Sequence, residues 1–146
     1  MPIYVCLIAW VVLMGHRPMY YYDSGWGRNP HFGDAFEELL IKYGVDLCLW
    51  GHVHNLLETC PVNNGTCVND GEAPVHVVIG NGGMDLTKYP TAKSGIPTPS
   101  WVRYKLANFG WNEIVVDREK LRVDMYSDND SSLYHSTRLQ KQKKRK

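Results

Sequence analysis

The sequence lacks the features that mark several classes of protein. Its 16 Lys and Arg residues nearly balance its 15 Asp and Glu residues, giving a formal net charge of +1, so it has no broad attraction to nucleic acid or to an anionic membrane. One nearly continuous apolar stretch, Ile3 to Met14, is too short for a membrane span and lacks the charged leader and cleavage site of a signal peptide. We interpret it as a buried strand. The length of 146 residues, without an internal repeat, predicts one domain or part of one.

Cysteine is also scarce, with four residues in the chain. Cys6 and Cys48 lie inside apolar runs, which is typical of buried small hydrophobic residues. Cys60 and Cys67 bracket a turn-rich loop that can close into a small disulfide ring, and this loop contains the glycan acceptor triplet Asn64-Gly65-Thr66. The combination favours the secretory pathway. A zinc site at these two cysteines is disfavoured, because their spacing is long and no second cysteine pair exists.

Two apolar runs each end in a glycine followed by a histidine. Val11-Val12-Leu13-Met14 precedes Gly15-His16, and Val45-Asp46-Leu47-Cys48-Leu49-Trp50 precedes Gly51-His52-Val53-His54. Neither run alternates between apolar and polar residues, which is typical of strands that are covered on both faces.

A helix is predicted between the two runs. Asp34 suits its N-cap, Gly44 suits its C-terminal stop, and its apolar face has the i, i+3, i+4, i+7 spacing. That face consists of Phe36, Leu39, Leu40 and Tyr43. A helix that crosses over between two parallel strands brings His16 and His52 to the same edge of one sheet, where α/β proteins bind ligands.

The second half of the chain is predicted to be rich in β-structure. Residues 74–80 form a strand that ends at Asn81-Gly82-Gly83, residues 88–100 form a proline-rich loop, and residues 112–117 and 121–126 form a hairpin. Residues 127–146 are polar and end in a basic run, which predicts a disordered tail; a sorting signal or a contact with a polyanion is the alternative. His76, inside the first of these strands, is interpreted as a satisfied histidine of the core or the surface.

His52 and His54 form a His-x-His pair, and histidine is the commonest metal ligand in proteins. On its own such a pair is as readily a solvated, incidental feature. The strand and the glycine in front of it, together with the matching Gly-His at His16, favour metal binding. No comparable signal surrounds His135.

These segments resemble the last two metal-binding blocks of the calcineurin-like metallophosphoesterases, and more narrowly those of the purple acid phosphatases. The resemblance rests on Gly51-His52-Val53-His54 and on Leu13-Met14-Gly15-His16-Arg17-Pro18-Met19-Tyr20, and it extends from about Trp10 to Tyr126. It implies an α/β fold, in which residues 1–126 are the C-terminal part of a four-layer α/β/β/α sandwich with a β-rich end.

The resemblance also implies a dinuclear metal centre, with a ferric ion beside a zinc, manganese or ferrous ion. His16 and His52 would bind the divalent ion and His54 the ferric ion. His31 would contact the phosphate or protonate the leaving group, although an exposed loop histidine is an equally good interpretation of this residue. The implied substrate is a phosphate monoester, and the implied location is secreted, in the secretory pathway or lysosome-like.

The earlier blocks of the family, Gly-Asp-x-Gly, Gly-Asp-x-x-Tyr and Gly-Asn-His-Glu, are absent from the sequence. They carry the carboxylates that complete the centre. We therefore expect the isolated chain to be inactive, to hold at most a single zinc ion, and to self-associate through an exposed sheet edge. The alternatives are an inactive module with a binding or regulatory role, and a related enzyme that acts on phosphodiesters or nucleotides.

Overall fold

Two neighbouring parallel strands lie at one side of the first sheet, as the crossover arrangement predicts. The computed structural model describes residues 10–23 and 27–141; within them β1 (Val12–Gly15) pairs in parallel with β2 (Leu47–Trp50), and α1 (Pro30–Lys42) lies between the two in sequence. Their register pairs Gly15 with Trp50, so both strands end at the same edge of the sheet. Of the predicted buried strand between Ile3 and Met14, residues 3–9 lie outside the described residues. The described part, β1, is a strand, but the prediction of burial on both faces is wrong for it, because β1 is the edge strand of the sheet and leaves Val12 and Met14 exposed.

The helix begins five residues earlier than an N-cap at Asp34 predicts. Asn29 is its N-cap, because the Asn29 Oδ1 accepts a hydrogen bond of 3.1 Å from the Phe32 backbone N–H, and proline follows at the first helical position. The assignment of Asp34 as N-cap is therefore wrong. His31 lies in the first turn of the helix with an exposed side chain, and not in a loop. At the other end Gly44 adopts a φ of 64°, which suits its predicted role as the stop.

The buried face of α1 also differs from the predicted one. Gly33, Glu37 and Leu40 are buried, whereas three of the four predicted apolar positions are exposed. Those three are Phe36, Leu39 and Tyr43. Hydrophobic spacing alone missed the true face because its central residue is a carboxylate that finds partners inside the protein.

The first sheet is mixed and has six strands. β5 (Val75–Ile79) continues the parallel part beside β2, and β3 (Leu56–Asn63) pairs with it in antiparallel fashion. β4 (Thr66–Cys67) and β6 (Val102–Leu106) both pair with β3. The predicted strand at 74–80 is confirmed, and the proline-rich loop contains only the short 3-10 helix η1 (Ala92–Ser94).

A second, three-stranded antiparallel sheet follows. β7 (Gly110–Val116) and β8 (Lys120–Ser127) form the predicted hairpin. β9 (Leu133–Gln140) pairs with β8 along its length, so the prediction of a disordered tail from residue 127 is wrong for this segment. Its polar side chains bind inside the protein: His135 Nε2 and Thr137 Oγ1 lie 2.5 and 2.7 Å from Glu58 Oε2. Residues 142–146 lie outside the described part.

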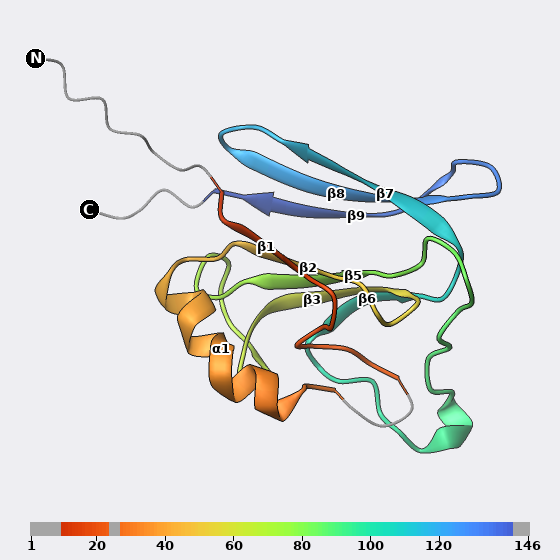
Figure 1. Ribbon diagram of the computed structural model, residues 1–146, viewed down its shortest axis with the longest axis horizontal. Helices are drawn as coiled ribbons and strands as arrows, with labels where there is room; N and C mark the ends of the chain where they lie inside the picture. Colours follow the sequence, from red (N-terminus) through yellow and green to blue (C-terminus); the bar gives the residue numbers. More distant parts are fainter. Residues whose placement is uncertain (1–9, 24–26, 142–146) are drawn as a thin grey trace, which may run out of the picture.

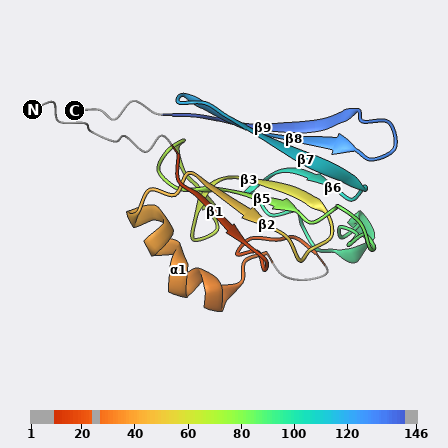
Figure 2. The same cartoon turned by 45° about the horizontal axis from the view of Figure 1, so that its top comes forward.

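The elements form three layers, with α1 on one face of the six-stranded sheet and the three-stranded sheet on the other (Figures 1 and 2). The apolar residues between the two sheets are Leu47, Leu49, Leu56, Val75, Val77, Leu121, Val123 and Met125. The opposite face packs against the helix and the loops through a second core that includes Tyr20, Leu40, Cys48, Trp50, Leu57, Val78 and Trp101. None of the helices in the described residues is long and apolar enough to cross a membrane.

His76 is fully buried in β5, where its Nδ1 accepts a hydrogen bond of 3.0 Å from the Trp50 indole N–H. Burial lowers the pKa of His76 from 6.5 to about 3, because the charged imidazolium would lose its hydration. The unfolded chain therefore binds a proton near pH 6.5 that the folded chain does not bind until about pH 3, so the folded state is stabilised above this window and loses stability as the pH falls through it.

We expect the free energy of unfolding to fall by up to about 1.4 kcal/mol per pH unit below pH 6.5 because of this residue. Urea unfolding at several pH values between 7 and 4 measures the slope. His76→Gln should lower stability at pH 7 but flatten the slope. An unchanged slope in the variant would show that other groups carry the pH dependence.

The interior between the two sheets is open along one flank, which is formed by β1 and β7. Val12 and Met14 pair with the buried Leu47 and Leu49 and so share their inward face, yet they are 40% and 72% exposed. On the other sheet Ile114 and Val116 pair with the buried Val123 and Leu121, yet they are 45% and 55% exposed. Core-facing side chains of both sheets thus meet water beside two strand edges, which is typical of an association surface.

We expect the chain to self-associate through this open flank, which sedimentation velocity at increasing protein concentration would detect. Ile114→Lys should weaken the association about tenfold or more, since burial of an isoleucine contributes about 1.5–3 kcal/mol. Val115→Lys is the matched control, because Val115 lies on the outer face of the same strand. A monomer at all concentrations, or equal effects of the two variants, would contradict this prediction.

Candidate functional site

His16 and His52 meet at the edge where β1 and β2 end. His52 Nδ1 lies 3.1 Å from His16 Nε2, and the two rings meet edge to face with their centroids 4.9 Å apart. Two nitrogens that bind one tetrahedral zinc ion at about 2.0–2.1 Å are about 3.3 Å apart, so the pair fits two ligands of a single ion. The predicted convergence of the two strand ends is confirmed; the role of the residues as ligands stays a prediction.

The backbone after β2 turns sharply to present His52. His52 has a φ of 63°, in the left-handed region that is costly for a residue other than glycine. The Gly51 N–H donates to the His16 carbonyl over 3.1 Å, which joins the two histidine segments through the backbone. The Gly80 position, after β5, also admits only glycine, because a Cβ there would overlap the carbonyl oxygen of Val53.

His54 faces a different partner. Its Nδ1 lies 2.5 Å from Asp85 Oδ1, and its backbone N–H donates to Thr87 Oγ1 over 3.2 Å. Within the described residues no group of three or more His, Cys, Asp or Glu side chains is arranged to hold a metal ion. Sequence reasoning missed Asp85. The available signal was its position a few residues after β5, the next parallel strand of the same sheet.

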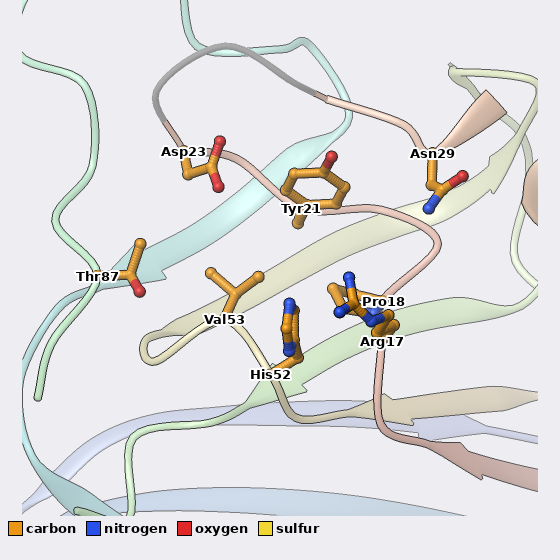
Figure 3. A pocket seen from close by; sticks show the side chains of 8 residues that line it. All are labelled: Arg17, Pro18, Tyr21, Asp23, Asn29, His52, Val53 and Thr87. Atoms are coloured by element: carbon orange, nitrogen blue, oxygen red, sulfur yellow. The ribbon is translucent and has the colours of Figure 1, made fainter. Parts of the chain in front are cut away.

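A pocket of about 240 Å³ opens beside His52. Figure 3 shows the residues that line it, which come from the loop after β1, the N-cap of α1 and the loops that contain His52 and Thr87. These residues are Arg17, Pro18, Tyr21, Asp23, Asn29, His52, Val53 and Thr87. His31 is not among them, although it lies two residues after Asn29. The structure thus leaves the predicted catalytic role of His31 without a contact in this pocket.

The charges around the pocket act on its ionisable groups. Burial, the Arg17 guanidinium and the two neighbouring histidines lower the pKa of His52, which favours the neutral imidazole that can bind a metal. Burial and the nearby Asp23 carboxylate raise the pKa of Tyr21, so its hydroxyl keeps its proton and remains a hydrogen-bond donor.

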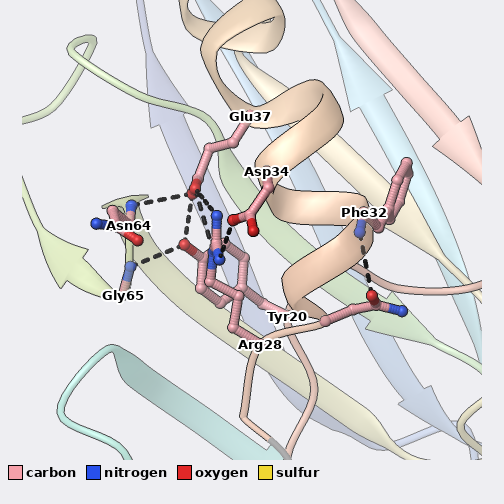
Figure 4. Close-up of polar contacts among 8 residues, drawn as sticks. Tyr20, Arg28, Phe32, Asp34, Glu37, Asn64 and Gly65 are labelled. Carbon is pink, nitrogen blue, oxygen red and sulfur yellow. Dashed lines mark hydrogen bonds and ion pairs between the residues drawn. The ribbon is translucent and has the colours of Figure 1, made fainter.

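A buried polar cluster fixes the loop that forms one wall of the pocket (Figure 4). The Tyr20 hydroxyl donates to Glu37 Oε1 of α1, and Arg28 Nη2 lies 2.9 Å from Glu37 Oε2. Burial, followed by the hydrogen bond to Glu37, raises the pKa of Tyr20. The hydroxyl therefore keeps its proton, and its hydrogen bond to Glu37 is already made.

The same cluster holds the hairpin turn between β3 and β4. The backbone N–H of Asn64 donates to Glu37 Oε1 over 3.1 Å, and that of Gly65 donates to the Tyr20 oxygen over 2.9 Å. A disulfide joins Cys60 to Cys67 on either side of this turn, which is the pairing that the sequence allows. Cys48 is free and buried, as predicted; Cys6 lies outside the described residues.

Comparisons with known proteins agree with this geometry. A family model for calcineurin-like phosphoesterases matches residues 8–56, and a model described as iron/zinc purple acid phosphatase-like protein C matches residues 73–136. An Arabidopsis thaliana protein named probable inactive purple acid phosphatase 9 is 31% identical over 135 residues, which cover 85% of this chain and 21% of that protein. A Hordeum vulgare protein named nucleotide pyrophosphatase/phosphodiesterase is 27% identical over 142 residues, which cover 87% of this chain and 37% of that protein.

The structure of a purple acid phosphatase from yellow lupin (Lupinus luteus) seeds matches this fold with a TM-score of 0.77 and 27% identity, over 90% of this chain and 25% of the lupin chain. The predicted α/β sandwich is thereby confirmed, with the helix and two sheets of the described residues as its visible layers. The chain spans between about a fifth and two fifths of the length of these relatives. It belongs to the calcineurin-like metallophosphoesterases and is of the purple acid phosphatase type.

Proposed function

We propose that the chain supplies the histidine part of a metal-dependent phosphoric monoester hydrolase of the acid phosphatase type. The observation that carries this proposal is the convergence of His16 Nε2 and His52 Nδ1 at the carboxyl ends of two parallel strands. The pocket beside His52 gives room for a substrate group next to these nitrogens.

The metal donors in the described residues fit one ion better than two. His16 and His52 offer two nitrogens at a suitable separation, and His54 is held by Asp85 instead of joining them. No carboxylate in the described residues bridges the histidines, so a ferric ion paired with zinc, manganese or ferrous iron would need ligands from other polypeptide. A divalent ion, when bound, supplies positive charge that polarises a phosphate ester.

The chain's own residues have two roles in this proposal. His16 and His52 hold the ion, and the pocket that His52 lines orients the ester. For His31 we retain the predicted contact with the phosphate or with the leaving group. His31 lies in the first turn of α1 and does not line the pocket, so this part of the proposal rests on the resemblance alone.

The names of the relatives support two alternatives. The Arabidopsis protein is named a probable inactive phosphatase, which favours an inactive module that acts by binding. The Hordeum protein is named a nucleotide pyrophosphatase/phosphodiesterase, which favours phosphodiester or nucleotide substrates. Measurement of metal binding and of hydrolysis separates the first alternative from an enzyme.

We also propose a secretory or lysosome-like location and a glycan on Asn64. The Cys60–Cys67 disulfide is typical of oxidising compartments. The acceptor triplet lies in the exposed turn that this disulfide closes, where Asn64 has a φ of 46° and an exposed side chain.

We expect the purified chain to bind at most one divalent ion, and His52→Ala to abolish that binding because one of two converging nitrogens is lost. Zinc titration calorimetry and elemental analysis measure the affinity and the stoichiometry. His31→Ala is the control, since His31 does not contact the histidine pair, and it should bind zinc as the wild type does. Two tightly bound ions per chain would contradict the assignment.

We further expect negligible hydrolysis of a chromogenic phosphate monoester by the isolated chain, with or without added zinc, because the carboxylate ligands are missing. Robust turnover that His52→Ala abolishes would show that these residues supply a complete active site.

A further inference from the structure

The pocket beside His52 is rich in hydrogen-bond donors. The Arg17 guanidinium, the Asn29 amide and the hydroxyls of Tyr21 and Thr87 surround one hollow, and a single carboxylate, Asp23, lies at its far side (Figure 3). These groups come from separate loops that the fold brings together. Several donors around one hollow, with one carboxylate at its edge, are the arrangement of a site that binds an anion.

The donors are available to a ligand. Arg17 forms no ion pair and no side-chain hydrogen bond with any residue in the described ranges, yet its charge reaches His52 and lowers the pKa of that histidine. Asn29 uses its Oδ1 to cap α1, where it accepts from the Phe32 N–H. Its Nδ2 has no hydrogen-bond partner among the described residues, and Figure 3 shows the amide nitrogen turned toward the hollow.

We propose that Arg17 binds the phosphoryl group of the substrate, assisted by the Asn29 amide and the Tyr21 hydroxyl, and that Asp23 limits the site to a single phosphoryl group. This inference rests on the proposed phosphatase function of the same site. A guanidinium presents parallel N–H donors that match two oxygens of a phosphate. Its position next to the His16–His52 pair would hold the ester beside the metal-binding nitrogens.

Asp23 provides the selectivity. A second phosphate that extended across the pocket would approach this carboxylate, and like charges at short distance repel each other. The pocket therefore favours a phosphate monoester over a pyrophosphate or a nucleoside polyphosphate. This choice distinguishes the chain from the nucleotide substrates that the name of the Hordeum relative suggests.

The test is a titration of the full, metal-free chain with inorganic phosphate in the presence of a chelator, followed through the backbone amide signals of Asn29 and of residues 51–53. The wild type should bind phosphate. Arg17→Gln should weaken the binding about tenfold or more, because a hydrogen bond to a charged group contributes about 1.5–3 kcal/mol. Arg103→Gln, an exposed arginine of β6 that does not line this pocket, is the matched control and should leave the binding unchanged.

Two further variants test the other residues. Asn29→Asp keeps a good helix cap but replaces the amide donor with a negative charge, so it should weaken phosphate binding while the helix signals persist. Asp23→Asn should strengthen phosphate binding and should reduce the preference for inorganic phosphate over pyrophosphate.

The inference is overturned if the wild type does not bind phosphate, if Arg17→Gln and Arg103→Gln bind it equally well, or if acetate binds as tightly as phosphate. A stronger affinity of the wild type for pyrophosphate would overturn the role of Asp23. Zinc titration in phosphate-free buffer tests the proposed function separately. Zinc binding at His16 and His52 without phosphate binding would refute only the role of Arg17, and the reverse result would refute only the metal site.

Discussion

The contact between Gly15 and the Trp50 ring is the constraint on which the site depends. A Cβ atom at Gly15 would lie 2.5 Å from Trp50 Cζ3, so only glycine allows the indole to lie against the end of β1. The same indole donates to His76 of β5 and stacks on its ring. Trp50, the last residue of β2, thus contacts both the last residue of β1 and His76 within β5, and these contacts support the register of β1 with β2. Because that register is fixed, His16 and His52 leave the sheet at the same level and their ring nitrogens converge.

The two sides of the molecule differ in how well their side chains are covered by other parts of the chain. Around the histidines, Glu37 gathers Tyr20, Arg28 and the disulfide-closed hairpin turn into one polar cluster, which holds the pocket loop in place. Along the β1–β7 flank, side chains on the inward faces of both sheets are instead exposed. The metal site shows the same contrast, since two imidazoles converge without a carboxylate bridge in the described residues. The exposed core-facing side chains and the lack of a bridging carboxylate in the described residues both agree with a chain that spans a fraction of the length of its relatives.

The strand–helix–strand unit and the convergence of His16 with His52 could be predicted, because buried parallel strands have continuous apolar runs and a crossover helix fixes their direction. β3 and β9 were missed for a common reason. Their polar residues find partners inside the protein, as Glu58 does with His135 and Thr137, and a sequence does not reveal such pairs. The buried face of α1 was hidden in the same way by Glu37. Asp85 could have been noticed from its place after β5, but its contact with His54 depends on a loop whose course no periodicity predicts.

The central claim is that one ion is bound between His16 and His52. Imidazole nitrogen NMR of the uniformly ¹⁵N-labelled chain, recorded as zinc is added, tests it most directly because it identifies the binding nitrogen of each ring. We expect His16 Nε2 and His52 Nδ1 to shift together to the values of metal-bound nitrogens, while His76 and His135 do not change. Zinc-dependent shifts at His31 or His135, or a shift at only one member of the pair, would contradict it.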